Sequence, residues 1–95
     1  MTHSIIVSPR AGKDAERLDQ RLMEYGPAIA ARFGDLLEQA ILNLAEHPSR
    51  GRSVGPTTRE VNIPFGQSAY IVRYRVTANR VTITRIWHGL ELRRR

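Results

Sequence analysis

The alternation of hydrophobic and polar residues predicts a strand followed by a helix at the start of the chain. Residues 3–8 form a short run rich in β-branched side chains, which is typical of a strand. Ser8 and Pro9 then form a helix start, with Ser8 as the N-cap and Pro9 in the first turn, where a missing N–H costs nothing. The apolar residues that follow at spacings of four, three and four are Ala11, Ala15, Leu18 and Leu22. They predict one buried face of a helix that ends near Tyr25.

A second helix follows after a Gly-Pro break at residues 26–27. The polar residues of the first helix occupy its opposite face, which we expect to be solvated; they are Lys13, Asp14, Arg17, Gln20, Arg21 and Glu24. Over residues 27–46 an apolar stripe repeats close to the helical period; it consists of Ile29, Phe33, Leu36, Leu37, Ala40, Ile41 and Leu44. His47 precedes a proline and therefore ends this helix. Together the two segments predict an antiparallel helical hairpin.

Three strands are predicted beyond a loop at residues 49–58, which is rich in glycine and proline. Residues 59–65 alternate between apolar and polar side chains, and Pro64, which has no amide donor, places the end of this strand at an edge or bulge. A loop at residues 66–68 leads into a strand at 69–76, and a polar turn at 77–80 leads into another at 81–87. Asn79 in that turn is able to adopt a positive φ, so a tight antiparallel hairpin is expected.

The element order β-α-α-β-β-β predicts one α+β domain over residues 1–95, with the helical hairpin packed on a mainly antiparallel, twisted sheet. The chain has no cysteine, which excludes disulfides and thiolate metal sites and fits a reducing cytosol. No apolar run approaches the ~20 residues that a bilayer requires, and no signal peptide is visible. A cytoplasmic protein without membrane contact is therefore expected.

The charge is unevenly distributed and almost all of it comes from arginine. The chain has a formal net charge of +6, and Lys13 is its one lysine among fifteen basic residues. Residues 49–95 carry ten arginines and two acidic residues, whereas residues 1–48 carry five basic and seven acidic residues. This asymmetry favours an anionic partner, such as a nucleic acid, a nucleoprotein or an acidic protein. Arginine in place of lysine favours bidentate contacts to phosphate or carboxylate.

Several segments, in this order and spacing, resemble the ParE/RelE superfamily of toxins from type II toxin–antitoxin systems, and the ParE branch in particular. The similar segments are S-P-R-A-G-K-D-A-E-R-L at 8–18, E-H-P-S-R-G-R-S-V at 46–54, Y-I-V-R-Y-R-V at 70–76 and V-T-I-T-R-I-W-H-G at 81–89, with Tyr25 near the end of the first helix. A last strand that ends in Arg-Ile-x-His-Gly looks like the ParE terminus. The resemblance covers nearly the whole chain.

The resemblance implies a small toxin neutralised by a cognate, ParD-like antitoxin, of a kind linked to plasmid stabilisation. ParE-type members poison DNA gyrase and block replication without enzymatic activity of their own, whereas members of the RelE type are ribosome-dependent mRNA endonucleases. A basic nucleic-acid-binding domain without toxicity is a third reading. Contact with DNA or with the ribosome is compatible with these readings. No cofactor is expected, and no His-carboxylate spacing or Gly-rich phosphate loop predicts a metal or nucleotide site.

RNA cleavage by 2′-hydroxyl attack would need a base, an acid and cations on the phosphate. The candidates are His88, Arg73 and Tyr70. Histidine side chains titrate near pH 6.5 in water, which suits proton transfer. However, Tyr70 occupies a position where the nuclease branch often carries arginine, and the His-Gly pair also fits the non-nuclease branch. The sequence therefore favours a binding toxin over an enzyme and commits to no catalytic residue.

Most of the remaining aromatic residues of the sheet are expected to be structural. Tyr70, Val72, Tyr74 and Val76 share one face of their strand. We expect this face to pack against the helices. Trp87 is expected to pack there too, with a stacking platform for a nucleic-acid base as the alternative. Arg73, Arg75, Arg80 and Arg85 are candidates for a basic patch on the exposed sheet. Arg85 shares the strand parity of Trp87, so a half-buried, paired guanidinium is the alternative for it.

Partner contacts are expected at the basic loop, the tail and the margin of the second helix. Arg50 and Arg52 are candidates for pairing with antitoxin carboxylates. The apolar stripe that contains Phe33 and Leu37 is wider than a small sheet can cover, so its margin is a candidate contact for an antitoxin segment. The tail formed by Arg93, Arg94 and Arg95 is a candidate contact for gyrase, DNA or the antitoxin.

Overall fold

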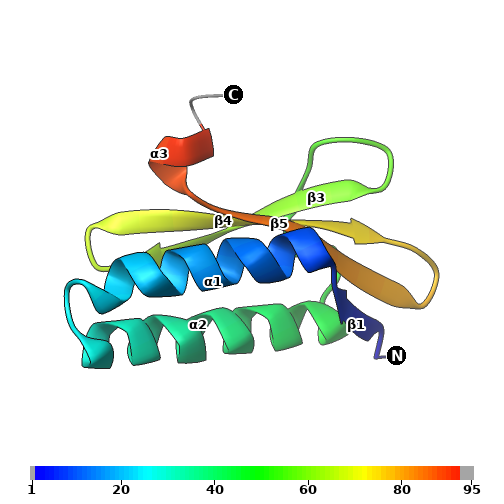
Figure 1. The fold of residues 1–95 in the computed structure, drawn as a ribbon. Helices are drawn as coiled ribbons and strands as arrows, with labels where there is room; N and C mark the ends of the chain where they lie inside the picture. Colours follow the sequence, from blue (N-terminus) through cyan, green and yellow to red (C-terminus); the bar gives the residue numbers. More distant parts are fainter. Residues whose placement is uncertain (1, 93–95) are drawn as a thin grey trace.

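The computed structural model describes residues 2–92 and has the predicted α+β architecture (Figure 1). Its elements are β1 (Ser4–Val7), α1 (Pro9–Met23), α2 (Pro27–Glu46), β2 (Arg52–Ser53), β3 (Thr58–Phe65), β4 (Ser68–Val76), β5 (Arg80–His88) and α3 (Gly89–Leu92). The predicted order of the main elements is confirmed. The two short elements β2 and α3 were not predicted from the sequence.

Within the described chain the strands form one five-stranded sheet with the order β1-β5-β4-β3-β2. β1 pairs with β5 in parallel, and all the other neighbours are antiparallel. The helical hairpin of α1 and α2 lies on one face of this sheet, while α3 lies at the far end of β5 (Figure 1). Among the described residues no long helix covers the opposite face, so polar side chains can spread across it (Figure 1).

The helix boundaries follow from local chemistry. The hydroxyl of Ser8 accepts the backbone N–H of Ala11 at 3.1 Å, and a proline occupies the first turn of α1, as predicted. Gly26 joins the two helices with φ 143°, a value that side-chain-bearing residues rarely adopt. α2 has the predicted bounds, whereas α1 ends at Met23, slightly before the predicted Tyr25.

The core fills the space between the helical hairpin and the sheet. It includes the tyrosines of β4, because Tyr70 is 5% exposed and Tyr74 is fully buried. The ring of Phe33 lies 4.4 Å from that of Tyr70 between centroids. The expectation that the Tyr–Val face of β4 packs against the helices is therefore confirmed. The buried hydroxyl of Tyr74 donates to Pro48 O and accepts from the Gly51 N–H, both at 2.8 Å, which ties the loop after α2 to the sheet.

A β-bulge in β5 changes which of its residues face the helices. Arg73 pairs with Arg85 and Tyr74 pairs with Ile83, so Thr84 is the extra residue. The core positions of β5 therefore shift from Ile83 to Ile86 instead of continuing with strict alternation. The core lies beneath the helices. This shift places the side chains of Arg85 and Trp87 outside it, on the open face of the sheet.

The expectation that Trp87 packs beneath the helices is therefore wrong. Trp87 is only 3% exposed, yet its ring is covered on the open face by the guanidinium groups of Arg73 and Arg85, whose carbons each lie 4.8 Å from the ring centroid. The bulge at Thr84 is the physical reason, since a one-residue insertion reverses the side-chain parity of a strand. Because the two guanidinium groups cover the ring, Trp87 does not offer an open surface on which a nucleic-acid base could stack.

Asn79, which is able to take a positive φ, does not adopt one in the β4–β5 turn. Among the described residues, glycine alone adopts positive φ, at Gly26 and Gly66. The β4–β5 turn is closed instead by the Thr77 N–H, which donates to Arg80 O at 3.0 Å. This closure is compatible with negative φ throughout the turn, so the left-handed conformation is not needed there.

We predict that replacing Gly51 by alanine destabilises the fold by about 2 kcal/mol. A methyl group at Gly51 would lie 2.6 Å from the carbonyl oxygen of Glu60 and 2.7 Å from the hydroxyl of Tyr74. Gly34 is the matched control, because an added Cβ there meets nothing within 4 Å. In the middle of α2, Gly34→Ala should stabilise by about 0.5–1 kcal/mol. Urea unfolding measures both, and equal effects of the two variants would contradict the prediction.

Candidate functional site

The open face of the sheet carries a chain of ion pairs centred on Glu60. This residue is 5% exposed and its carboxylate binds Arg52 at 3.2 Å and Arg73 at 2.7 Å. Arg73 also donates through Nε at 2.8 Å and covers the ring of Trp87. A buried carboxylate with two guanidinium partners satisfies its oxygens without water. The guanidinium of Arg73, one of the catalytic candidates, is thus already held by a carboxylate and a ring.

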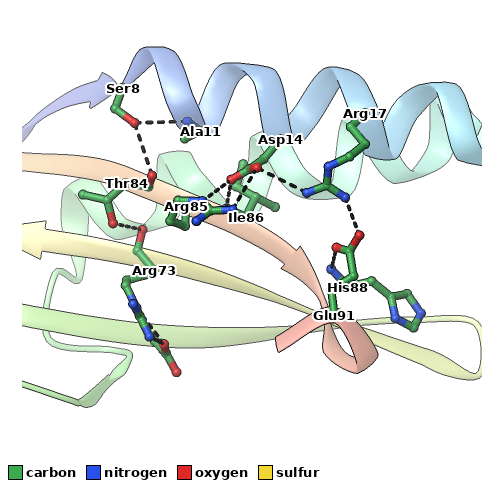
Figure 2. Close-up of polar contacts among 11 residues, drawn as sticks. Ser8, Ala11, Asp14, Arg17, Arg73, Thr84, Arg85, Ile86, His88 and Glu91 are labelled. Atoms are coloured by element: carbon green, nitrogen blue, oxygen red, sulfur yellow. Dashed lines mark hydrogen bonds and ion pairs between the residues drawn. The ribbon is translucent and has the colours of Figure 1, made fainter. Parts of the chain in front are cut away.

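A second buried carboxylate closes the unpaired edge of β5. Beyond Ile83, the last residue of β5 that pairs with β1, the edge of β5 runs alongside α1. There Asp14 accepts the backbone N–H of Ile86 at 2.9 Å and binds Nε of Arg85 at 2.9 Å, while Arg17 contacts it at 3.2 Å (Figure 2).

The expectation that Asp14 lies on a solvated helix face is therefore wrong, since Asp14 is 5% exposed. The helical pattern alone assigned it to the polar face of α1. That face is covered in part because α1 takes the place that a longer β1 would have occupied beside β5. A carboxylate is suited to this position because an unpaired strand edge needs hydrogen-bond acceptors.

Glu91 likewise accepts a backbone N–H from the unpaired edge of β5, that of His88. Its carboxylate accepts the backbone N–H of His88 at 3.0 Å and binds the guanidinium of Arg17, with Arg21 at 3.6 Å (Figure 2). Arg17 therefore bridges two carboxylates, one from its own helix and one from α3. This bridge fixes α3, and with it the start of the C-terminal segment, against α1.

Both carboxylates remain charged at neutral pH. Burial would raise the pKa of Asp14, but hydrogen bonds from Arg85, the Ile86 N–H and Arg17 outweigh it and hold the pKa below its usual value. The pKa of Glu91 is likewise lowered, because the His88 N–H and Arg17 together outweigh the opposing effect of burial. Both groups therefore act as acceptors and counter-ions.

A pocket of about 620 Å³ brings together two of the three catalytic candidates. His88 and Tyr70 both line it, with their rings edge to face and their centroids 5.1 Å apart. Nδ1 of His88 accepts the backbone N–H of Leu90 at 3.1 Å. Burial raises the pKa of Tyr70, so its hydroxyl stays protonated at neutral pH. Arg73 does not line this pocket, because it lies on the other face of the sheet.

Sequence reasoning missed two further residues that line this pocket, Arg21 and Tyr25. Arg21 was predicted to lie on the solvated face of its helix, and Tyr25, which follows that helix, is 74% exposed. Their position close to the last strand depends on how α1 crosses the sheet. A helical pattern cannot give that information, although Tyr25 was among the positions of the family resemblance.

The residues predicted to contact partners fall into three groups. Phe33 and Leu37 are core residues, with 2% and 8% exposure, whereas their neighbour Leu36 on α2 is 37% exposed. Arg50 and Arg52 lie exposed in the loop and strand after α2. The three tail arginines at 93–95 lie outside the described residues. Leu36 is thus the accessible member of the predicted margin.

Residues 2–92 contain neither a metal-ligand cluster nor a helix that could span a membrane. No group of three or more His, Asp or Glu residues is arranged to hold a metal ion in this part of the chain. In the same range, no helix is both long and apolar enough to cross a membrane.

The fold has a counterpart among solved structures. A solved structure described as a chromosomal ParDE TA system from P. aeruginosa superposes with a TM-score of 0.74 at 19% identity, over 92% of this chain and 96% of that one. At this identity the match speaks for the fold alone.

The sequence comparisons establish the family. The family model described as the ParE toxin of the type II toxin–antitoxin system parDE matches residues 5–93. The protein named Toxin RelE1 of Caulobacter vibrioides is 60% identical over 98% of this chain and 100% of its own length. Toxin RelE3 of the same organism is 37% identical over 95% of this chain and 98% of its own. The chain belongs to the ParE toxin family of type II toxin–antitoxin systems, which confirms the resemblance seen in the sequence.

We predict that Asp14→Asn lowers the free energy of unfolding by about 2 kcal/mol. The amide keeps an acceptor for the Ile86 N–H, but Arg85 loses its charged partner. Asp19→Asn is the control, because Asp19 lies exposed on the same helix. Urea unfolding at pH 7 should separate the two variants.

The pH dependence of stability should change in the same variant. The folded-state pKa values of Asp14 and Glu91 lie below their unfolded values, so their contribution is present above about pH 4 and is lost as pH falls through the folded pKa values. The wild-type free energy of unfolding should therefore fall below about pH 4, and less steeply in Asp14→Asn. Parallel pH profiles for the two proteins would contradict this assignment.

Proposed function

We propose that this toxin acts by binding and poisoning DNA gyrase in the cytoplasm, and that a ParD-like antitoxin neutralises it. The observation that carries the proposal is the state of the sheet arginines. Arg73 is held by Glu60, and Arg85 by Asp14, so neither guanidinium is available to a scissile phosphate without loss of a buried ion pair. Breaking such a pair leaves a buried charge uncompensated, at a cost of about 3–5 kcal/mol.

The pocket around His88 also lacks a complete acid–base pair. Tyr70 cannot serve as a general base at neutral pH, because burial raises its pKa. Glu91 is anionic and already accepts from His88 N–H and Arg17, so it cannot donate a proton as a general acid. His88 would have to serve as both acid and base. This chemistry favours a binding toxin over a nuclease.

A ribosome-dependent mRNA endonuclease is the second candidate. His88 and Tyr70 lie together in the 620 Å³ pocket, and Arg21 at its rim is 61% exposed through its side chain. Arg21 is 3.6 Å from Glu91, a looser pair than those of Arg73 and Arg85, so it is the cation most able to turn toward a phosphate. The two Caulobacter relatives are named RelE toxins, which also supports testing this candidate.

Two assays separate the candidates. Purified toxin should inhibit gyrase supercoiling and trap cleaved DNA, while mRNA on a translating ribosome stays intact. His88→Gln should keep full activity, since the proposal gives this side chain no chemical role, and Glu60→Gln should lose activity only as far as it loses stability. Cuts in mRNA that follow codon position, abolished by His88→Gln, would overturn the gyrase proposal and establish the alternative.

The C-terminal arginines are proposed as a gyrase contact. We predict that replacing Arg93, Arg94 and Arg95 together with alanine raises the toxin concentration needed for half-inhibition of gyrase by about 10-fold or more, because three cations near an anionic protein–DNA complex contribute strongly at low salt. The control replaces Arg10, Lys13 and Arg32, which are exposed and remove the same charge. Equal effects of the two triple variants would reduce the tail to a general charge effect.

A further inference from the structure

The pocket of about 620 Å³ beside the C-terminal end of α1 has no part in the proposed action on gyrase. Side chains from α1, β4, β5 and α3 line it. Its volume lies within the range of sites that bind small molecules. The polar groups that face this pocket therefore indicate what kind of ligand it could hold.

The hydroxyl of Tyr70 is an unused hydrogen-bond donor in this pocket. Tyr70 is only 5% exposed, and among residues 2–92 its hydroxyl has no hydrogen-bond partner. The oxygen is not sealed inside the protein, because Nδ1 of His3 is the one sealed and unpaired side-chain atom in the described chain. The hydroxyl of a buried tyrosine normally finds a partner. Here it faces the pocket instead.

His88 supplies a second donor, because its other ring nitrogen is occupied. Nδ1 accepts the backbone N–H of Leu90 at 3.1 Å, so the proton of the neutral imidazole lies on Nε2. The ring packs edge to face against Tyr70, with 5.1 Å between the centroids, and both rings line the pocket. The N–H of His88 and the O–H of Tyr70 are therefore available together.

The charges around the pocket leave one guanidinium without a full counter-ion. Three cations meet two anions in this cluster, namely Arg17, Arg21 and Arg85 against Asp14 and Glu91. The carboxylate of Glu91 already accepts the His88 N–H and the guanidinium of Arg17. Arg21 has the longest contact, at 3.6 Å, and its side chain is 61% exposed. The excess positive charge therefore lies on Arg21, which lines the pocket.

A set of four hydrogen-bond donors thus surrounds the pocket. This donor set consists of Arg21, Ser68, Tyr70 and His88. The hydroxyl of Ser68, like that of Tyr70, has no partner among the described residues. A phosphate monoester has three terminal oxygens for such donors, whereas a carboxylate has two. One uncompensated cation suits a single phosphate better than a polyphosphate chain, so the donor set fits one phosphate group.

The remainder of the pocket is suited to a flat, partly apolar group. Leu22 and Leu90 line it, and so does Tyr25, whose side chain is 74% exposed. An exposed tyrosine ring offers a face on which any nucleic-acid base can stack. Donors for a phosphate and a ring for a base therefore occur in one pocket.

We propose that this pocket binds a free nucleoside monophosphate, with its phosphate on the donor set and its base on the ring of Tyr25. The site goes beyond the proposed action on gyrase. It also uses none of the arginines that are held by carboxylates on the open face of the sheet.

Isothermal titration calorimetry with purified toxin tests the class of ligand. We expect 5′-AMP to bind about 10-fold or more tightly than inorganic phosphate or adenosine, because only the nucleotide contacts both parts of the pocket. No binding of 5′-AMP at millimolar concentration would overturn the proposal, and so would equal affinities for the three probes. A short single-stranded RNA that binds more tightly than 5′-AMP would assign the pocket to a nucleic-acid strand and would also overturn it.

A matched pair of tyrosine variants tests the unused hydroxyl. Tyr70→Phe should weaken the binding of 5′-AMP by about 10-fold, because it removes a donor to a charged group and keeps the ring. Tyr74→Phe is the control, because the hydroxyl of Tyr74 on the same strand bonds to Pro48 O and the Gly51 N–H outside the pocket. This control should lose stability but keep its affinity for 5′-AMP. Wild-type affinity in Tyr70→Phe would contradict the assignment of the phosphate.

A matched pair of charge variants tests the cation. Arg21→Gln should weaken the binding of 5′-AMP by about 10-fold or more, because the phosphate loses its charged donor. Lys13→Gln removes the same charge from an exposed position on the same helix, outside the pocket, and should bind 5′-AMP normally. Equal losses in the two variants would show a general charge effect and overturn the proposed site.

Binding of 5′-AMP is measured on the toxin alone, so it is separate from the proposed target. A toxin that binds 5′-AMP but leaves gyrase supercoiling unchanged would refute the gyrase proposal alone. A toxin that poisons gyrase but does not bind 5′-AMP would refute the nucleotide site alone.

Discussion

The unpaired end of β5 is the constraint on which much of the structure depends. β1 pairs with β5 only as far as Ile83, so the N–H groups of Ile86 and His88 have no neighbouring strand on that side. An unsatisfied buried N–H costs about 1–3 kcal/mol. Asp14 and Glu91 supply the missing acceptors from α1 and α3. The sheet edge is thus completed by side chains, and this solution determines where both helices can lie.

The two carboxylates in turn determine the roles of the nearby arginines. A buried carboxylate requires cations, and Arg17 and Arg85 provide them. Arg85 then lies over Trp87, on which Arg73 also rests. Three arginines of the second half of the chain, Arg52, Arg73 and Arg85, therefore pair with buried acids. The net charge of +6 therefore overstates the positive charge that a partner can contact. The exposed arginines after α2, Arg50 and Arg52, become the stronger candidates for partner contacts.

The sequence predicted best those features that depend on local chemistry and regular periodicity. The bounds of α2, the cap at Ser8 and the burial of Tyr74 follow from a helical period, an N-cap and strand alternation. It failed where regular alternation is interrupted. The extra residue Thr84 reverses the parity of β5, so Trp87 was assigned to the wrong face.

The position of Asp14 was inaccessible for a different reason. A carboxylate on the polar side of an amphipathic helix has no local sign that a strand edge will lie against it. The burial of Asp14 depends on the length of β1, which is a property of another segment. The same holds for the pocket of His88 and Tyr70, since Arg21 reaches it only through the crossing of α1 over the sheet. Sites built from distant segments need the fold before they can be identified.

The commitment of the arginines also bears on how one fold can serve two kinds of toxin. A binding toxin and a ribonuclease can share this sheet, because activity depends on which cations on the sheet are free to meet a phosphate. Here Glu60 holds Arg73 in an ion pair, so this guanidinium is not free to meet a phosphate. The matching family model carries the name ParE, whereas the two Caulobacter relatives carry the name RelE. The carboxylate partner of each arginine therefore carries information on the site's chemistry that the names of the relatives do not.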